Sequence, residues 1–353
     1  MRASAFLLLV VLAIAGCGSG GGSPGKSGPV DLGTGTAVQV AARDRLNVYR
    51  TASGAGKAGL VEPIKSAAVR HAGYQALKVR SGYFQTTGGG PLDPADSAAA
   101  LFSGIDVGAR MRVAFLSYNA LNPADQPDLA LPITADERLA PTGSTATGAA
   151  LVDALWVGIY SRLPLMRHGY IGFGYGDRAH AGEAFPANGI DPDGDAMATL
   201  DFGEAPGVAR SYGLWPNRAV GKVTGSYDPG KDEPPMTLLT GRGILGVPSH
   251  LIHPTGLPWT FITATVTPVT LPSGFPAVPA TPIGPAQSPF IVVSSTAVTG
   301  PDVIQDSPTS ILPGELFIVP KAALASGWWQ IQVVATTQGE SVSSNYVWEI
   351  QSR

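Results

Sequence analysis

The segment at residues 170–176 (YIGFGYG) is the feature that most restricts how this chain can fold. Its bulky side chains, Ile171, Phe173 and Tyr175, alternate with glycines. Alternate residues of a β-strand point to opposite faces, so one face of this strand would carry no side chains. Such a face lets a helix or another backbone approach closely. The segment therefore predicts a strand whose glycine face is covered by a helix.

Apolar spacing predicts helices and further strands around this segment. Glu62 and Pro63 begin one helix, because proline suits a first turn. Ile64, Ala68 and His71 would share the apolar face of that helix. The predicted helices span residues 38–49, 62–76, 94–102 and 148–160, and the predicted strands span residues 110–117 (RMRVAFLS) and 196–202 (AMATLDF).

The chain after residue 205 has a different pattern, in which short apolar runs are separated by proline and glycine. Trp329, Ile331 and Val333 alternate with glutamines, as expected of a half-buried strand. Gln338 and Gly339 suit the turn between the last two strands. Strands of this kind predict a β-sandwich. The predicted strands span residues 261–266, 290–293, 316–319, 329–334 and 346–350.

The first residues resemble a bacterial lipoprotein signal. Arg2 precedes an apolar run at residues 6–15, which is too short to span a bilayer. Cys17, the only cysteine, follows Ile14-Ala15-Gly16 as in a lipobox. The lipidated chain would sit at the outer face of a membrane in the bacterial cell envelope, the outer membrane in a Gram-negative organism. The alternative is an ordinary signal peptide with a chance cysteine.

These patterns divide the chain into four parts. Residues 1–16 are predicted as a signal peptide and residues 17–36 as a Gly/Ser tether. Residues 37–205 form a predicted α+β domain, and residues 206–353 a predicted β-sandwich domain. Charged residues are only 14% of the sequence and the net charge is −3, which argues against a nucleic-acid partner.

Pieces of the first domain, taken in order, resemble the bacterial form of the CAP superfamily, the cysteine-rich secretory, antigen 5 and pathogenesis-related domains. The resemblance covers residues 37–205 and implies an α-β-α sandwich. The region after it resembles the C-terminal Ig-like modules that follow some bacterial CAP domains. The matching pieces are residues 45–50 (RLNVYR), 67–76 (AAVRHAGYQA), 153–165 (DALWVGIYSRLPL), 170–176 (YIGFGYG) and 200–203 (LDFG).

The CAP resemblance implies a cavity with two histidines and usually two acidic residues, which can hold a divalent metal. His71 aligns with the first histidine, whereas Ser161, between Tyr160 and Arg162, replaces the second. Residues 104–117 contain no glutamate. Zinc takes three or four protein ligands, and of the implied set His71 alone is clearly present, so we expect no metal here. The expected function is non-catalytic binding of a lipid, an envelope protein or a polysaccharide.

Two other functions remain open. A hydrolase could use His71 with Ser161 or an acidic partner as a triad. However, no helix N-terminus or Gly-rich turn precedes Ser161 to supply an oxyanion hole. A purely structural envelope protein is the second alternative.

Weaker alternatives concern cations. His71 could hold a divalent metal with His168 displaced towards it. Asp106 is a poor substitute for a missing acid, and Glu137 is predicted in a loop. The other histidines, His180, His250 and His253, are predicted in loops. A Ca²⁺ site is conceivable at Asp191, Asp193 and Asp195, but Ala196 and Phe202 occupy the positions where an EF-hand needs glycine and glutamate.

Overall fold

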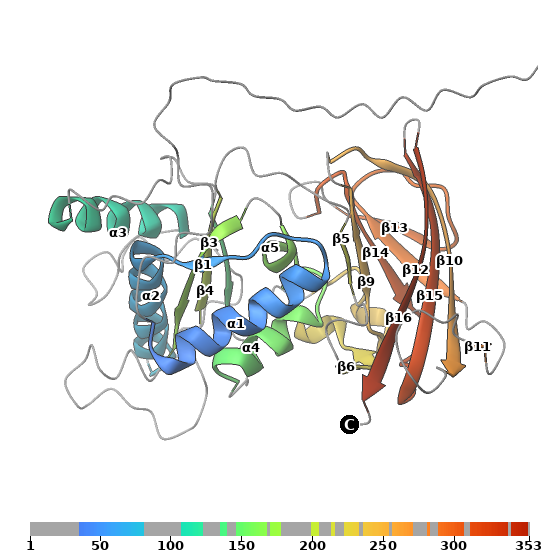
Figure 1. Ribbon diagram of the computed structural model, residues 1–353, viewed down its shortest axis with the longest axis horizontal. Helices are drawn as coiled ribbons and strands as arrows, with labels where there is room; N and C mark the ends of the chain where they lie inside the picture. The colour runs from blue at the N-terminus through green and yellow to red at the C-terminus, as the bar shows by residue number, and fades with distance from the viewer. Residues whose placement is uncertain are drawn as a thin grey trace, which may run out of the picture.

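Figure 1 shows a computed structural model in which a helix-rich half lies beside a sheet-rich half. The chain is mixed α+β with a β-sandwich, as its sequence predicts. No helix in the described part of the chain is long and apolar enough to cross a membrane. The structure describes residues 35–80, 107–122, 135–139, 146–167, 170–177, 199–204, 213–215, 222–232, 236–253, 256–270, 281–282, 289–306, 311–337 and 340–351.

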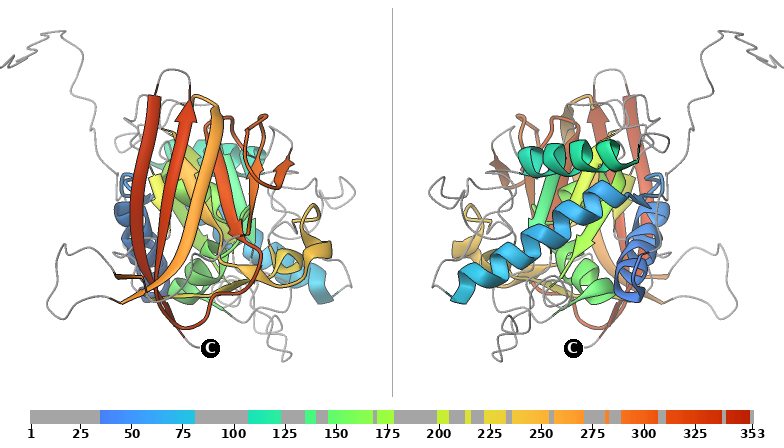
Figure 2. Two further views of the ribbon diagram at one scale, coloured as in Figure 1. Left: turned by 90° about the vertical axis from the view of Figure 1, so that its right-hand side faces the viewer. Right: turned by 90° about the vertical axis from the view of Figure 1, so that its left-hand side faces the viewer.

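The helix-rich half has three layers, with a four-stranded sheet between two groups of helices (Figure 2). The strand order is β1 (Gly59–Leu60), β3 (Tyr170–Gly176), β4 (Thr199–Glu204) and β2 (Ala135–Leu139). The helices are α1 (Ala37–Ala52) and α4 (Gly148–Trp156) on one side, α2 (Glu62–Arg80) and α3 (Val107–Leu121) on the other, and the short α5 (Leu163–Met166) after α4.

The glycine face of β3 is covered by α2, which confirms that prediction. A Cβ atom added to Gly174 would lie 2.4 Å from the backbone carbon and oxygen of Ile64. A Cβ atom added to Gly176 would lie 2.4 Å from the corresponding atoms of Ala68. On the opposite face, the Tyr175 hydroxyl accepts a 2.7 Å hydrogen bond from the backbone N–H at the start of α4. The two faces of β3 therefore fix the positions of the two helix layers.

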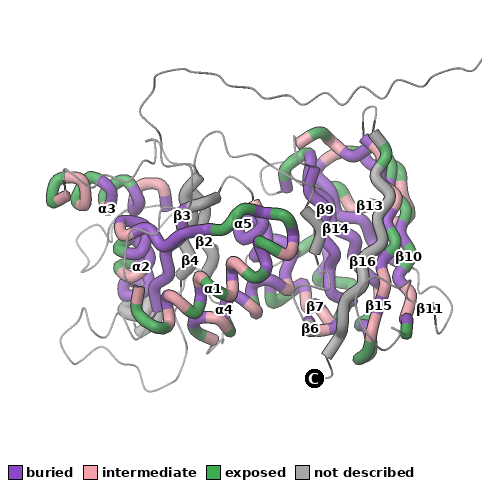
Figure 3. Tube along the Cα trace, in the orientation of Figure 1, coloured by how far each residue is buried: buried purple, intermediate pink, exposed green. Residues whose placement is uncertain are grey.

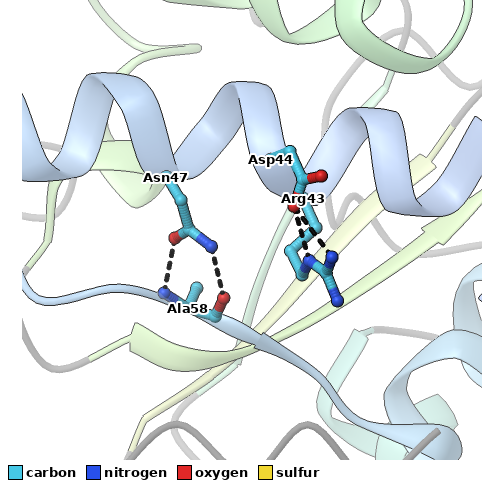
Figure 4. A network of polar contacts seen from close by, with 4 residues as sticks. All are labelled: Arg43, Asp44, Asn47 and Ala58. Carbon is cyan, nitrogen blue, oxygen red and sulfur yellow. Dashed lines mark hydrogen bonds and ion pairs between the residues drawn. The ribbon is translucent and has the colours of Figure 1, made fainter.

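Residues of the RLNVYR segment hold α1 in place. Asn47 exchanges hydrogen bonds of 2.9 and 2.8 Å with the backbone of Ala58, just before β1 (Figure 4). The Tyr49 ring stacks on Trp156 of α4 at 4.3 Å, and its hydroxyl donates to Asp153 at 2.7 Å. The guanidinium of Arg50, fully buried, donates to backbone carbonyls around α5. The segment therefore connects α1 to the sheet and to α4.

The prediction of a strand at residues 110–117 is wrong, because these residues lie in α3. The buried positions Val107, Met111 and Phe115 recur every four residues and pack against α2. The helical period is hidden in the sequence because Val113 and Leu116, on the outer side, are also apolar yet exposed. The strand β2 was not predicted, and the helix predicted to reach residue 160 ends at Trp156. The helix predicted at residues 94–102 lies outside the described residues.

The sheet-rich half consists of two five-stranded sheets packed face to face. One sheet has the order β11 (Thr281–Pro282), β10 (Trp259–Thr270), β15 (Gly327–Thr337), β16 (Glu340–Gln351) and β6 (Lys222–Thr224). The other has the order β13 (Val303–Gln305), β12 (Phe290–Ser294), β14 (Glu315–Pro320), β9 (Ser249–Ile252) and β5 (Gly213–Trp215). A two-stranded ladder, β7 (Ser226–Tyr227) with β8 (Leu245–Gly246), lies beside them.

All five strands predicted in this half are present, but β12 and β14 are not half-buried. Every residue of both strands is buried (Figure 3). One face of this sheet packs into the sandwich core. The other face, with Val293 and Phe317, packs against Ile159, Tyr160 and Leu163 of the helix-rich half. The second sheet is therefore the layer through which the two halves join.

Candidate functional site

The turn after α4 lies against the second sheet and carries most of the predicted site residues. The side chain of Arg162 is fully buried in this turn. Its guanidinium donates to the carbonyls of Trp156 at 2.6 Å and Val157 at 3.1 Å, where α4 ends, and to Pro248 of the sandwich at 2.7 Å. Burial lowers the pKa of this guanidinium, and the neighbouring Asp232 carboxylate opposes that shift. Arg162 therefore caps a helix and connects the two halves at once.

Asp232, from the sheet-rich half, is the acceptor at the centre of this contact. Its two carboxylate oxygens accept hydrogen bonds from three consecutive backbone N–H groups: Ile159 at 2.7 Å, Tyr160 at 3.1 Å and Ser161 at 3.1 Å. They also accept from the hydroxyls of Ser161 at 2.9 Å and Tyr227 at 2.8 Å. Hydrogen bonds to a charged acceptor are stronger than neutral ones. We call these five residues the Asp232 cluster.

The tyrosines of the contact act as hydrogen-bond donors. Burial, together with the Asp232 carboxylate, raises the pKa of Tyr227 well above its ordinary value. Burial and the hydrogen bond to Asp306 likewise raise the pKa of Tyr160, whose hydroxyl donates to Asp306 at 2.6 Å. Both phenols therefore stay protonated at neutral pH. Tyr160 thus gives the helix-rich half a second polar contact with the sandwich.

Ser161 is held as a structural hydroxyl. Only 2% of the residue is exposed, and its single proton is shared between the Leu155 carbonyl at 2.7 Å and Asp232 Oδ1 at 2.9 Å. A serine nucleophile needs a base within hydrogen-bond reach that takes this proton. The Asp232 carboxylate lies within that reach, but it already accepts hydrogen bonds from Ile159, Tyr160 and Tyr227. Because the hydroxyl is also buried, the arrangement is that of a structural contact.

His71 is not brought together with Ser161. It lies in α2, on the glycine face of β3, whereas Ser161 follows α4 on the other side of the sheet. Only 1% of His71 is exposed, and its ring stacks near Tyr74 at a centroid distance of 6.1 Å. Among the described residues, no group of three or more His, Cys, Asp or Glu side chains is arranged to hold a metal ion.

Two other histidines were predicted in loops, and the structure contradicts this for His250 but not for His253. His250 belongs to β9 rather than to a loop; it is buried and stacks on Phe317 at 4.1 Å. His253, just after β9, is buried with its ring edge-on to Trp259 at 5.3 Å. Glu137 lies in β2, opposite Asp201 of β4. The remaining predicted residues, Cys17, Asp106, His168, His180, Asp191, Asp193 and Asp195, lie outside the described residues.

Sequence reasoning missed Asp232. It sought an acidic partner for Ser161 inside residues 37–205, whereas Asp232 lies 71 residues further along the chain, in the region assigned to the sandwich. A short 3-10 turn follows β7 at Pro229–Lys231, with Asp228 at its start and Asp232 at its end, so Asp228 is an equally acidic candidate. Nothing local distinguishes the two aspartates, because the difference is a long-range contact.

The Asp232 cluster leaves no room for a side chain at position 158, so we predict that it requires glycine there. A Cβ atom there would lie 2.1 Å from Ser161 Oγ and 2.2 Å from Asp232 Oδ1. Gly158→Ala must therefore displace both groups, and we expect a loss of about 2–3 kcal/mol in the free energy of unfolding. Ser161→Ala removes only the hydroxyl, so we expect a loss of about 1 kcal/mol. Urea titrations of both variants measure the difference, and equal losses would contradict this account.

Comparisons with known proteins add little. No family model matches the chain, and no curated protein matches it. Among solved structures, the chain is similar at 15% identity to selenomethionine PcoC, a copper resistance protein from Escherichia coli. The alignment covers 30% of this chain and 82% of PcoC, with a TM-score of 0.16. A similarity this weak carries no argument about fold or function.

Proposed function

We propose that the protein is a surface-anchored bacterial lipoprotein whose degenerate CAP domain serves as a non-catalytic module that binds a lipid or an envelope partner. The observation that carries this proposal is the place of Ser161. Where the family resemblance expects a histidine of the cavity, the chain has a buried serine bonded to Asp232. Residues that would line a reactive cavity instead join the domain to a β-sandwich.

The layered arrangement supports the CAP part of the proposal. The glycines of β3 contact α2, and the RLNVYR residues hold α1 against β1 and α4. The Asp232 cluster would then serve to hold the helix-rich half and the sandwich together as one unit. A purely structural role in the envelope remains the alternative if no binding partner is found.

Absence of catalysis is tested with a serine-directed fluorophosphonate probe on the folded full chain. We expect no labelling of Ser161, because its hydroxyl is 2% exposed and already bonded. The same preparation is titrated with Zn²⁺, and we expect no stoichiometric binding at micromolar concentration. Labelling that is lost in Ser161→Ala, or zinc binding that is lost in His71→Ala, would overturn the non-catalytic proposal.

Lipid anchoring is predicted to depend on Cys17. Cells that express the protein are grown with an alkyne analogue of palmitate. The wild-type protein should become labelled and Cys17→Ser should not, because the labelled lipid is attached through a thioether to the thiol of Cys17. Ser19→Ala, two residues away in the tether, is the matched control and should keep the label. An unlabelled wild type, or an equally labelled Cys17→Ser, would rule out the anchor.

A further inference from the structure

The outer face of the first sheet of the sandwich is turned away from the helix-rich half. Along β10, Ile262, Ala264 and Val266 are buried in the core, and the intervening residues point outward. Along β15, Ile331, Val333 and Ala335 are buried in the same way. We call the outward positions of these two strands the β10–β15 face; they are Phe261, Thr263, Thr265 and Thr267 in β10, and Trp328, Gln330, Gln332, Val334 and Thr336 in β15.

Register makes this face continuous across the strands. Thr265 pairs with Gln332, and Thr267 pairs with Gln330. On the far side of β15, Gln332 pairs with Asn345 of β16. Within the described part of the chain, the side chains of Thr263, Thr265 and Gln332 make no hydrogen bond to another residue. Rows of hydroxyl and amide groups are therefore available to a ligand.

The nine positions of the β10–β15 face carry no charge; in the next strand, Glu349 of β16 pairs with Trp328. The nine residues include neither a carboxylate nor a cation. Exposed sheets are normally protected from edge and face association by lysine and glutamate. A face of threonine and glutamine instead offers neutral donors and acceptors, which match a ligand that is itself uncharged and rich in hydroxyl groups.

Aromatic side chains lie at the two ends of this face. Trp328 begins the row in β15, and Phe261 pairs with Thr336 at the other end. The eight-residue step from Trp328 to Thr336 corresponds to about 27 Å at the rise of a β-strand. Sugar rings bind aromatic rings through their C–H faces while their hydroxyls take hydrogen bonds. The face thus combines both interactions on a rigid, extended surface.

We propose that the β10–β15 face binds a neutral polysaccharide, laid along the strands between Trp328 and Phe261. The proposal deepens the binding function proposed above by naming a ligand class, and it rests on the protein being a binding module. It does not depend on the lipidation of Cys17 or on the CAP resemblance. A glycan bound here would meet the sandwich on the side opposite to the Asp232 cluster.

Affinity electrophoresis of the folded full chain tests the proposal. Native gels contain laminarin, dextran or galactomannan as neutral probes and alginate as an anionic probe. We expect retardation by at least one neutral polysaccharide and none by alginate. Trp328→Ala removes an aromatic contact and the double variant Gln330→Ala/Gln332→Ala removes hydrogen bonds of about 1 kcal/mol each. Each should weaken the apparent affinity by about tenfold, which corresponds to about 1.4 kcal/mol. The control Thr237→Ala/Thr240→Ala removes exposed hydroxyls elsewhere and should change nothing.

Every other outcome overturns the proposal. Migration of the wild type unchanged by all three neutral polysaccharides would exclude the ligand class. Retardation by alginate alone would indicate an anionic ligand. Retardation that survives both face variants would place binding elsewhere. Urea titration of each variant establishes that it is folded, and the palmitate and fluorophosphonate experiments report on the proposed function independently of these results.

Discussion

Asp232→Ala is expected to lower the free energy of unfolding by about 3–5 kcal/mol, the cost of removing one partner from a buried charged contact. The variant leaves three backbone N–H groups and the hydroxyl of Tyr227 without their acceptor. It also removes the carboxylate that opposes the desolvation of the buried Arg162. Buried donors without partners each cost about 1–3 kcal/mol, so the effect should exceed that of any single donor.

The measurement is urea unfolding followed by two signals. Circular dichroism at 222 nm reports mainly on the helices, and fluorescence reports mainly on the sandwich, because Trp156 is the only one of the six tryptophans before residue 213. In the wild type we expect the two transitions to coincide. In Asp232→Ala the helical transition should come first, since the lost contacts hold the α4 turn to the second sheet.

Asp228→Ala is the matched control for this experiment. Asp228 lies at the start of the same turn, and among the described residues its carboxylate accepts only the exposed N–H of Gly230, at 3.0 Å. We expect a loss below about 1 kcal/mol and coincident transitions. An Asp232→Ala variant as stable as Asp228→Ala would show that the Asp232 cluster does not join the two halves.

Local patterns predicted the elements whose partners lie on one side only. The helix α1 and the strands β10 and β15 each have one apolar and one polar side, so the period is visible in the sequence. The strand β3 was predictable for another reason, since its glycines admit a close neighbour whatever the rest of the chain does. The helix α3 was missed because Val113 and Leu116 are apolar on its exposed side.

The burial of β12 and β14 on both faces could have been predicted from the sequence. The runs FIVV and LFIV, in β12 and β14, are continuous apolar stretches with no alternation. Such runs are typical of strands covered on both sides. They could have indicated that another part of the chain covers the sandwich. They could not have indicated that the covering part is the turn at Ile159 and Tyr160, because that depends on contacts more than a hundred residues apart.

The candidate site illustrates the same limit. Tyr160, Ser161 and Arg162 were selected by resemblance, and the structure places all three in one contact. The resemblance aligned position 161 with a histidine that lines a cavity, whereas the side chain bonded to Ser161 is Asp232, from the other half. The serine at position 161 is visible in the sequence. The carboxylate that accepts a hydrogen bond from this serine, Asp232, can be identified only from the structure.

Gly176→Ala is expected to destabilise the helix-rich half by about 3 kcal/mol. The new Cβ atom would lie 2.4 Å from the backbone carbon and oxygen of Ala68 and 2.5 Å from the backbone nitrogen of Val69. Because these are main-chain atoms in the middle of α2, no side-chain rotation can relieve the overlap. The helix must move away from β3, which loosens packing along its length and costs about 1–3 kcal/mol or more.

Gly56→Ala is the control, since a Cβ atom at Gly56 would meet nothing within 4 Å. We expect this variant to unfold within about 0.5 kcal/mol of the wild type, as surface changes usually do. Urea titration followed at 222 nm compares the two. Gly174→Ala, which meets the backbone of Ile64 at 2.4 Å, should behave like Gly176→Ala. If both β3 variants matched Gly56→Ala, α2 could not lie on the glycine face, and the layered arrangement would fail with it.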